Sequence, residues 1–373
     1  MGAAGAPAGI VRSMARQAVV LSYRLGGTDG VSVEARKWEW ALGELGFTTR
    51  RVAGELCGAP SPDDVALPGL AIEPLAGAAA DTGALAAALD GADLVIAENI
   101  CSLPLNLDAS YAAADALRRH RSRVLFHHHD LPWQRARLAA IRDVPPAIPG
   151  ALHVVLSERS RRELADRGVI ATTIRNTFDF DAPPGARKPT RTDFGFDDAD
   201  LVVLQPTRAI ARKHVPGGVR FSEALADLVP DRRVVYWLTG PAEDGYGPTL
   251  TQALAATSLP VVLGRAASAA DAYAAADVVV FPSTWEGFGN PVIESVIARR
   301  PLAAHHYPVL DEIVAAGLHM FGVEHPGEVA AFLDAPDPAL FETNLELARR
   351  DYSLADLPGR LHAAFVDHGW RSW

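Results

Sequence analysis

The feature that most constrains the fold is an alternation of short apolar runs with helix-forming segments, which occurs twice along the chain. In the first half, apolar runs such as 18–24, 93–99 and 123–129 alternate with segments rich in alanine, arginine and glutamate, and a helix is expected around 133–142. Strands that alternate with helices form right-handed crossovers in a parallel sheet covered by helices on both faces. The first half is therefore predicted to be a doubly wound α/β domain.

The alternation stops and then restarts near the middle of the chain. Residues 178–200 are rich in proline, glycine and charge and follow neither the strand nor the helix period. Further apolar runs follow from 201 onward, again separated by helical segments. We therefore expect, in order, an N-terminal Rossmann-like domain over 1–180, a linker over 181–198, a C-terminal Rossmann-like domain over 199–352, and a C-terminal helix over 353–373 that can pack back onto the first domain. Ligands of such sheets bind at the carboxyl ends of the strands, so two domains that face each other would form a cleft.

Composition and charge exclude several classes of protein. The chain has 373 residues and a formal net charge of −10, which disfavours a nucleic-acid partner. It has no apolar run of the roughly 18 residues that a membrane span needs, and its first residues lack the apolar core of a signal peptide. No integral membrane segment is expected, although a peripheral membrane contact is compatible with the arginine clusters at 117–123 and 158–167. Cys57 and Cys101 have no paired spacing, which favours a cytoplasmic location over a disulfide framework.

The most informative stretch is FPSTWEGFGNPVIES, residues 281–295, where an apolar strand runs into a glycine turn and a helix. Glu286 follows the strand, and Glu294 lies one turn into the helix. Asn290 is expected to cap that helix and Pro291 to occupy its first position. Two glycines let a ligand approach the free N–H groups of the helix start, which is typical of an anion site. The alternative is an ordinary strand-to-helix turn with surface glutamates.

Two further stretches follow the first strand of each predicted domain. Arg208 and Lys213 lie just after the strand at 201–208, where a guanidinium and an ammonium group would complement a diphosphate. Gly26 and Gly27 follow the strand at 18–24 and would let the backbone close on a phosphate, although a plain turn explains them equally well. The order of glycines is not G-x-G-x-x-G, which disfavours a nicotinamide dehydrogenase.

Together these stretches resemble the retaining glycosyltransferases of the GT-B fold, family 4, the group 1 glycosyl transferases. The matching features are the E-x7-E motif at Glu286 and Glu294, the R-x4-K pair at Arg208 and Lys213, and the double glycine. Residues 263–294 resemble the most specific segment of the family. The resemblance covers essentially the whole chain and is looser in the first half.

The resemblance implies a role for each matching residue. Glu294 is expected to bind the ribose hydroxyls of a nucleotide and Glu286 to face the donor sugar, while Arg208 and Lys213 hold the diphosphate. The remaining expected donor contacts are Gly26, Gly27, Gly264, Arg265, Gly287, Phe288, Gly289 and Asn290.

The active-site histidine of the family should be one of His127, His128 and His129. His129 is favoured because it adjoins Asp130 where the strand becomes a loop. Strand alternation is expected to bury one of the three and to expose its neighbours. Metal binding by the trio is a weaker alternative, since adjacent strand residues point to opposite faces. The D-x-D spacing at 178–181 falls beside the linker and is interpreted as linker.

The implied activity is transfer of a hexosyl group, with retained configuration and without a metal or other cofactor, from a nucleotide sugar to a hydroxyl group. The nucleotide is left open among UDP, GDP, ADP and TDP. The acceptor is expected to be a small hydroxylated molecule, such as a sugar, a glycerate-like compound or a natural-product aglycone. Residues expected on its side are Asn99, Asn106, Asp130, Trp133 and Gln134.

The sequence departs from the family after the E-x7-E motif. Where the family has small residues, this chain has Arg299-Arg300 and then His305-His306-Tyr307, so the donor is not assigned from this loop. Two other classes stay open. One is a GT-B-fold phosphorylase or sugar-nucleotide epimerase, and the other is a nucleotide-sugar-binding protein without catalysis.

Overall fold

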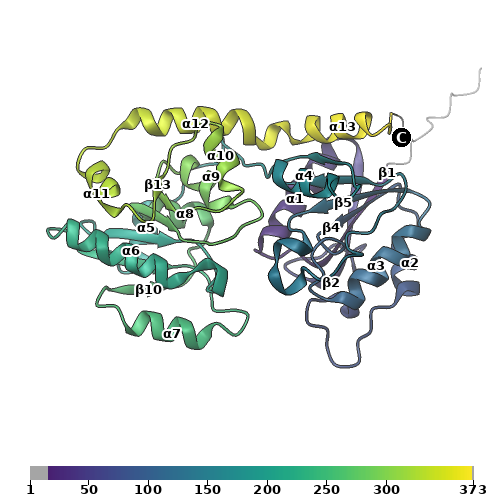
Figure 1. Ribbon diagram of the computed structural model, residues 1–373, viewed down its shortest axis with the longest axis horizontal. Coiled ribbons are helices and arrows are strands. Elements are labelled where there is room, and N and C mark those ends of the chain that lie inside the picture. Colours follow the sequence, from purple (N-terminus) through teal and green to yellow (C-terminus); the bar gives the residue numbers. More distant parts are fainter. Residues whose placement is uncertain (1–15, 372–373) are drawn as a thin grey trace, which may run out of the picture. The chain divides into compact units, whose positions relative to one another are not determined.

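The computed structural model describes residues 16–371. Contacts between residues divide the chain into two compact units (Figure 1). The first unit runs to Val154 and also includes the residues from Pro358 onward, and the second unit runs from Val155 to Leu357. The boundaries predicted from the sequence, 1–180 and 199–352, divide the chain at other points.

The first unit is built on a parallel sheet, which β7 (Ala171–Thr173) completes at one edge in the strand order β3-β2-β1-β4-β5-β6-β7. Its strands are β1 (Arg16–Leu25), β2 (Phe47–Leu56), β3 (Val65–Ala66), β4 (Leu94–Glu98), β5 (Arg123–His128) and β6 (Leu152–Val155). Its helices are α1 (Gly30–Glu44), α2 (Thr82–Leu89), α3 (Leu107–Arg119) and α13 (Leu357–Asp367), with 3₁₀ turns η1 (Pro68–Leu70), η2 (Pro132–Gln134) and η3 (Ala136–Leu138).

The second unit is built on a parallel sheet with the strand order β10-β9-β8-β11-β12-β13. These strands are β8 (Leu201–Gln205), β9 (Val234–Leu238), β10 (Val261–Leu263), β11 (Val278–Phe281), β12 (Leu302–Ala304) and β13 (Phe321–Gly322). Its helices are α4 (Glu158–Ala165), α5 (Arg187–Asp193), α6 (Val215–Leu228), α7 (Gly247–Ala255), α8 (Ala269–Ala275), α9 (Asn290–Ile297), α10 (Leu310–Ala315), α11 (Pro326–Asp334) and α12 (Pro338–Tyr352), with 3₁₀ turns η4 (Ala211–Lys213) and η5 (Leu354–Asp356).

Both sheets are buried on both faces, which explains why their strands read as continuous apolar runs. In β8, Val202 and Leu204 belong to one apolar cluster, which also includes residues of α8 and α9. Leu201 and Val203 belong to the other cluster, which includes residues of α6. Alternate side chains of one strand thus point into two separate apolar cores, and helices cover each core.

The expected helix around 133–142 is wrong. The chain there forms only the turns η2 and η3, and Gln134 closes the first by accepting a hydrogen bond from the N–H of Leu131 through its side-chain oxygen at 3.0 Å. A side chain that bonds the backbone locally in this way competes with helix formation.

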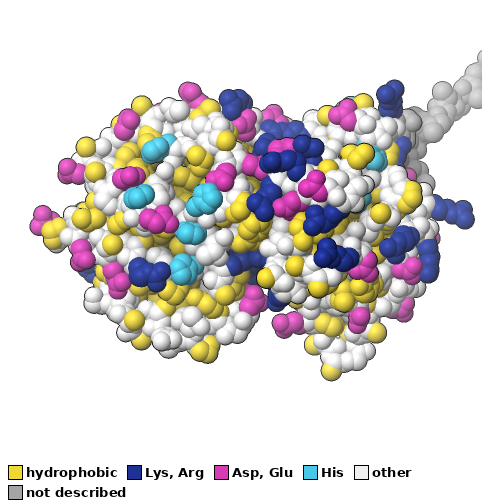
Figure 2. All heavy atoms as spheres, in the orientation of Figure 1, with side chains coloured by type: hydrophobic (Ala, Val, Ile, Leu, Met, Phe, Trp, Pro, Cys, Tyr) yellow, Lys and Arg dark blue, Asp and Glu magenta, His cyan; other side chains and the backbone are white. Residues whose placement is uncertain are grey.

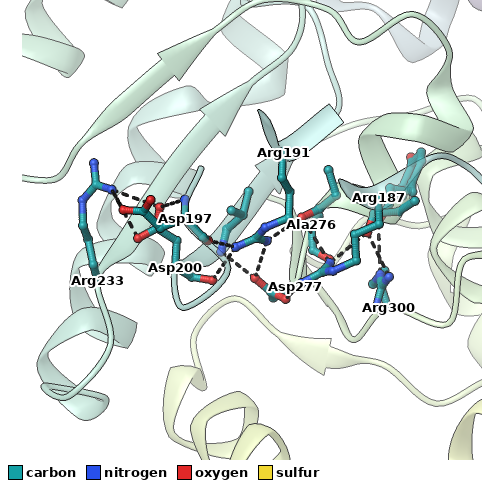
Figure 3. A network of polar contacts seen from close by, with 12 residues as sticks. Arg187, Arg191, Asp197, Asp200, Arg233, Ala276, Asp277 and Arg300 are labelled. Carbon is teal, nitrogen blue, oxygen red and sulfur yellow. Dashed lines mark hydrogen bonds and ion pairs between the residues drawn. The ribbon is translucent and has the colours of Figure 1, made fainter. Parts of the chain in front are cut away.

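The stretch expected to be a linker, 181–198, contains α5, and this helix is anchored within the second unit (Figure 3). Arg191 is 2% exposed and donates hydrogen bonds to the carbonyl oxygens of Ala275, Asp197 and Asp200 at 2.5–2.9 Å and to the carboxylate of Asp277 at 3.3 Å. Arg187 reaches the same carboxylate at 2.6 Å. Arginine side chains rather than an apolar period hold this helix, so hydrophobic periodicity did not reveal it.

Candidate functional site

The central feature of the second unit is a carboxylate held by two cations beyond the carboxyl ends of its strands. Glu286 follows β11, and Lys213 ends η4 after β8. Lys213 Nζ donates to Glu286 Oε1 at 2.5 Å, and Arg212 Nη1 donates to Glu286 Oε2 at 2.6 Å and to the carbonyl oxygen of Trp285 at 3.0 Å. The neighbouring strands β8 and β11 bring these two loops to one edge of the sheet.

Burial makes this cluster electrostatically strong. Glu286 is 6% exposed and Lys213 is 9% exposed. Burial alone would raise the pKa of Glu286, but Lys213 and Arg212 outweigh it and lower that pKa to about 2. Burial lowers the pKa of Lys213 to about 8. The charge of Glu286 opposes this shift, and the nearby guanidinium groups of Arg212 and Arg208 reinforce it. A carboxylate is therefore fixed as an anion beside a lysine whose charge depends on its surroundings.

The glycine turn after Glu286 has its own internal support. Gly289 has φ 100°, in the region that favours glycine, and a Cβ there would collide with the hydroxyl of Tyr307. That hydroxyl donates to the carbonyl oxygen of Phe288 at 3.0 Å. The ring of Phe288 is buried in the core, so only its backbone can face a ligand. Tyr307, noted only as a departure from the family, thus holds the turn in place.

The helix that follows the turn starts at Asn290, with Gly289 in the capping position. The expected Asn290 cap is wrong, because its side-chain oxygen accepts a hydrogen bond from Asn176 at 2.8 Å instead. Glu294 Oε2 accepts a hydrogen bond from the hydroxyl of Tyr273 at 2.6 Å. Burial and the Glu294 carboxylate raise the pKa of Tyr273 well above its usual value, so this phenol stays a donor.

The other expected donor contacts are more scattered. Arg208 is paired with Glu243 at 2.5 Å, and both side chains are about one third exposed. Gly264 follows β10 and accepts a hydrogen bond from the indole of Trp237 at 2.9 Å, and the exposed Arg265 comes next.

In the first unit, Gly26 has φ 81°, and a Cβ there would collide with the carbonyl oxygen of Cys57. The packing of the turn therefore requires this glycine, whether or not a phosphate approaches it. The carbonyl oxygen of Gly27 accepts a hydrogen bond from Arg36 Nη1 at 2.7 Å.

The three consecutive histidines of the first unit are all buried, because the sheet is covered on both faces. The expectation that alternation would expose some of them is therefore wrong. His127 Nδ1 and His129 Nε2 both bond Glu98 Oε2 at 2.8 Å. His128, on the other face, bonds Ser102 at 2.5 Å and His153 at 2.9 Å. His129, at 8%, is the most exposed of the three.

The expected acceptor residues separate into two groups. The side-chain oxygen of Asn99 accepts hydrogen bonds from the backbone N–H groups of His129 and Asp130, which places these three residues together. Asp130 is also paired with Arg135 at 2.9 Å. Trp133 and Gln134 lie in the adjacent turn η2. Asn106 lies apart from them, because its side chain caps α3 and bonds the carbonyl oxygens of Gly69 and Ala71.

A comparison with known protein families bears on the open interpretations. Residues 211–337, which include Lys213, Glu286 and Glu294, match the model of the family described as Glycosyl transferases group 1. This segment of the second unit is therefore similar to the group 1 glycosyltransferases. This match and the similarity to two proteins named as synthases, described next, support an enzyme of the hexosyltransferase type.

Two curated relatives bear the name mannosylglucosylglycerate synthase. The protein of Thermotoga maritima is 28% identical over 265 residues, which cover 62% of this chain and 61% of the relative. The protein of Petrotoga mobilis is 24% identical over 369 residues, which cover 79% of this chain and 84% of the relative. The match to the Thermotoga relative thus spans less than two thirds of that protein.

Solved structures of low sequence identity show the same fold. Anabaena HepE in complex with UDP and glucose has a TM-score of 0.70 at 16% identity, covering 94% of this chain and all of that one. Sucrose-phosphate synthase of Thermosynechococcus elongatus has a TM-score of 0.72 at 16% identity, covering 96% of this chain and all of that one. The predicted GT-B class, with two Rossmann-like α/β domains, is confirmed.

Three residues that contact the expected site residues Glu286, Glu294 and His129 were not identified from the sequence. Arg212 adjoins Lys213 but lies outside the R-x4-K spacing, and Tyr273 lies inside the family-like segment without a charge to mark it. Glu98 did leave a signal, since it is a charged residue at the end of an otherwise apolar strand. A charge in such a place needs buried partners, and the histidines of the next strand provide them.

Glu98, His127 and His129 could also hold a metal ion, because each offers a ligand atom and these atoms lie within 4.8 Å of one another. The nitrogen-to-oxygen distances of 2.8 Å are those of charge-assisted hydrogen bonds, and each histidine already gives one ring nitrogen to Glu98. The three side chains therefore form a hydrogen-bonded cluster in this structure.

Histidine side chains gather on the face of the second unit seen in Figure 2. Among the histidines of this unit, His305 is paired with Glu324 and His306 with Asp311. No helix within residues 16–371 is long and apolar enough to cross a membrane.

Proposed function

We propose that the chain is a retaining glycosyltransferase that moves a hexosyl group from a nucleotide-diphospho-sugar to a hydroxyl of a small acceptor, without a metal. The observation that carries this proposal is the buried cluster of Lys213, Arg212 and Glu286, within the segment that matches the family. Lys213 and Arg208 would bind the donor diphosphate. Glu286 would face the sugar, and Glu294 would accept hydrogen bonds from the ribose.

Stabilisation of the leaving group explains how this site can work. Departure of the nucleoside diphosphate adds negative charge on a phosphate oxygen, and a fixed cation in a buried site stabilises such charge far better than water does. Lys213 is such a cation. The phosphate itself would take the acceptor proton on the same face of the sugar. Retention then needs no second carboxylate as nucleophile, unlike in retaining glycosidases.

For the acceptor we propose a glycerate-type or glycosylated glycerate compound. Support comes from the two relatives, whose names contain a glycosylated glycerate. His129, Asp130 and Asn99 of the first unit would lie on the acceptor side. A cytoplasmic location, expected from the two cysteines, is part of the same proposal, and both cysteines are free.

A thermal-shift screen with UDP, GDP, ADP and TDP and their common sugars tests donor binding. A nucleotide at a hundred times its dissociation constant adds about 2.7 kcal/mol of stability, enough for a shift of several degrees. The Glu294→Ala variant, which removes the proposed ribose contact, is the control and should lose most of the shift.

The stabilising sugar nucleotide is then incubated with glycerate and glucosylglycerate, and products are separated by mass spectrometry. A new glycoside with retained configuration supports the proposal. Sugar phosphate formed from a glycan and phosphate would identify a phosphorylase, and an isomerised donor would identify an epimerase. Binding without turnover of any acceptor would favour the non-catalytic interpretation.

A further inference from the structure

The residue with the least explained chemistry in the first unit is Glu98. It is the last residue of β4 and is fully buried, in a strand whose other residues are apolar and buried. Burying an ionised carboxylate costs several kcal/mol unless hydrogen bonds and opposite charge compensate it. A glutamate in this position therefore needs a reason beyond packing.

Strand register determines which side chains meet Glu98. In the parallel pair β4 and β5, Glu98 is aligned with His127. Side chains two residues apart on a strand point to the same face, so His129 follows His127 on the face of Glu98, and His128 points away. One carboxylate thus contacts both histidines, through Oε2 at 2.8 Å in each case.

The contacts of Glu98 fix the orientation of the His129 ring. Because an ionised carboxylate only accepts, His129 Nε2 must carry a proton, and this leaves Nδ1 as the ring nitrogen for other partners. The backbone of His129 is held by the side chain of Asn99 at 3.2 Å. On the other side of Glu98, His127 is stacked on the indole of Trp38, with ring centroids 3.9 Å apart, and bonds the same carboxylate, so Glu98 is held from two sides.

We propose that Glu98 is a positioning residue, which holds the Nε2 side of His129 so that Nδ1 is presented to the substrate as a hydrogen-bond donor. This inference rests on the proposed function, with His129 on the acceptor side. The N–H group at Nδ1 would donate a hydrogen bond to an oxygen of the acceptor or of the transferred sugar. Among oxygen ligands, an anionic one such as the carboxylate of a glycerate-type acceptor would be bound most strongly.

The charges around His129 favour the form in which both ring nitrogens donate. Burial alone would lower its pKa, but the contacts with Glu98, together with the charges of Glu34 and Asp130, raise it. Glu34 and Asp130 are themselves paired with Lys37 and Arg135. The pKa of the neighbouring His127 is lowered, mainly by burial, so His129 is the more readily protonated of the two histidines.

The test is a double-mutant cycle with Glu98→Gln and His129→Ala. Glutamine keeps the shape of the side chain but replaces the negative charge. We expect Glu98→Gln to lower kcat at least tenfold and to move the alkaline limb of the pH profile at least one unit toward lower pH. In the His129→Ala background, Glu98→Gln should change kcat by less than threefold, because its effect acts through the missing ring.

Ser102→Ala is the matched control, since it removes a buried hydrogen bond to the adjacent His128 on the opposite face of β5. It should leave the pH profile unchanged. Thermal unfolding, compared with that of the wild-type chain, reports whether each variant is folded. Equal losses from Glu98→Gln in both backgrounds, or an unshifted pH profile, would overturn the inference.

Where Glu98→Gln does not fold, histidine-¹⁵N spectra of the wild-type chain decide the question. The resonance absent from His129→Ala must show a protonated Nε2 that stays protonated at pH 8, and an unprotonated Nε2 refutes the inference. A wild-type chain that transfers no sugar to any acceptor would count against the proposed function instead.

Discussion

Replacement of Lys213 by alanine is the most direct test of the donor site. Lys213 is 9% exposed and its ammonium nitrogen lies 2.5 Å from Glu286 Oε1, so bulk water does not readily replace it. Loss of one such preorganised contact to developing charge costs about 100-fold to 1,000-fold in turnover, or about 2.7–4 kcal/mol. We expect Lys213→Ala to lower kcat by at least 100-fold. The loss in the free energy of unfolding should be smaller than this loss of transition-state stabilisation, because Arg212 remains within 2.6 Å of Glu286 and keeps that carboxylate paired.

Steady-state rates with the identified donor and acceptor measure this effect, and thermal unfolding checks that the variant is intact. Lys188→Ala is the matched control, since Lys188 lies on the exposed side of α5 in the same unit. It should leave kcat within twofold. A folded Lys213→Ala enzyme with kcat within threefold of the wild type would refute the assignment of the leaving-group contact.

Four further outcomes are expected. Donor KM should rise above about pH 8, because a diphosphate needs the charged form of Lys213 and its pKa is lowered to about 8; a KM that stays flat to pH 9.5 would contradict this. Glu294→Ala should weaken nucleotide binding in calorimetry by at least tenfold, and Tyr273→Phe should weaken it less, since it removes only the hydroxyl that holds Glu294; unchanged affinity in both would exclude the ribose contact. Arg191→Ala should destabilise the second unit by about 3–5 kcal/mol in urea, because it breaks a buried ion pair and removes hydrogen bonds to three carbonyl oxygens, whereas the more exposed Arg187→Ala should cost less; equal effects would show that burial does not decide the cost. Activity should survive dialysis against EDTA, and a loss that Mg²⁺ or Zn²⁺ restores would show that a metal takes part.

Most of the fold could be predicted from the sequence because the strands are buried on both faces and therefore stand out as apolar runs. What could not be predicted lacks that signal. The strands β3 and β13 are two residues long, too short for any period. The helix α5 is anchored by Arg187 and Arg191, and its sequence resembles a linker because the groups that bind these arginines are mostly backbone carbonyls from distant segments.

The site was predictable to the extent that spacing along the chain fixes position. Lys213 and Glu286 each follow a strand, and the structure places them in contact because β8 and β11 are neighbours. Sequence spacing does not show which other side chains share their charge. Arg212 could not be separated from an ordinary surface arginine, and the contact between Tyr273 and Glu294 joins residues 21 positions apart through the packing of α8 on α9.

Each unit uses a buried carboxylate to hold a cationic group at the carboxyl end of a strand. Glu98 does so with His129, and Glu286 does so with Lys213. In both cases a second cationic or polar group, His127 or Arg212, also binds the carboxylate. A carboxylate that is bound on two sides cannot move together with its cation when a ligand binds. The cation must therefore use some of its donor hydrogens for the carboxylate and others for the ligand. Lys213, with three donor hydrogens, can add a phosphate oxygen without leaving Glu286, and His129 in its protonated form can do the same through Nδ1. Binding of an anionic ligand at either place therefore requires no rearrangement of buried charge, which is the condition for a preorganised site.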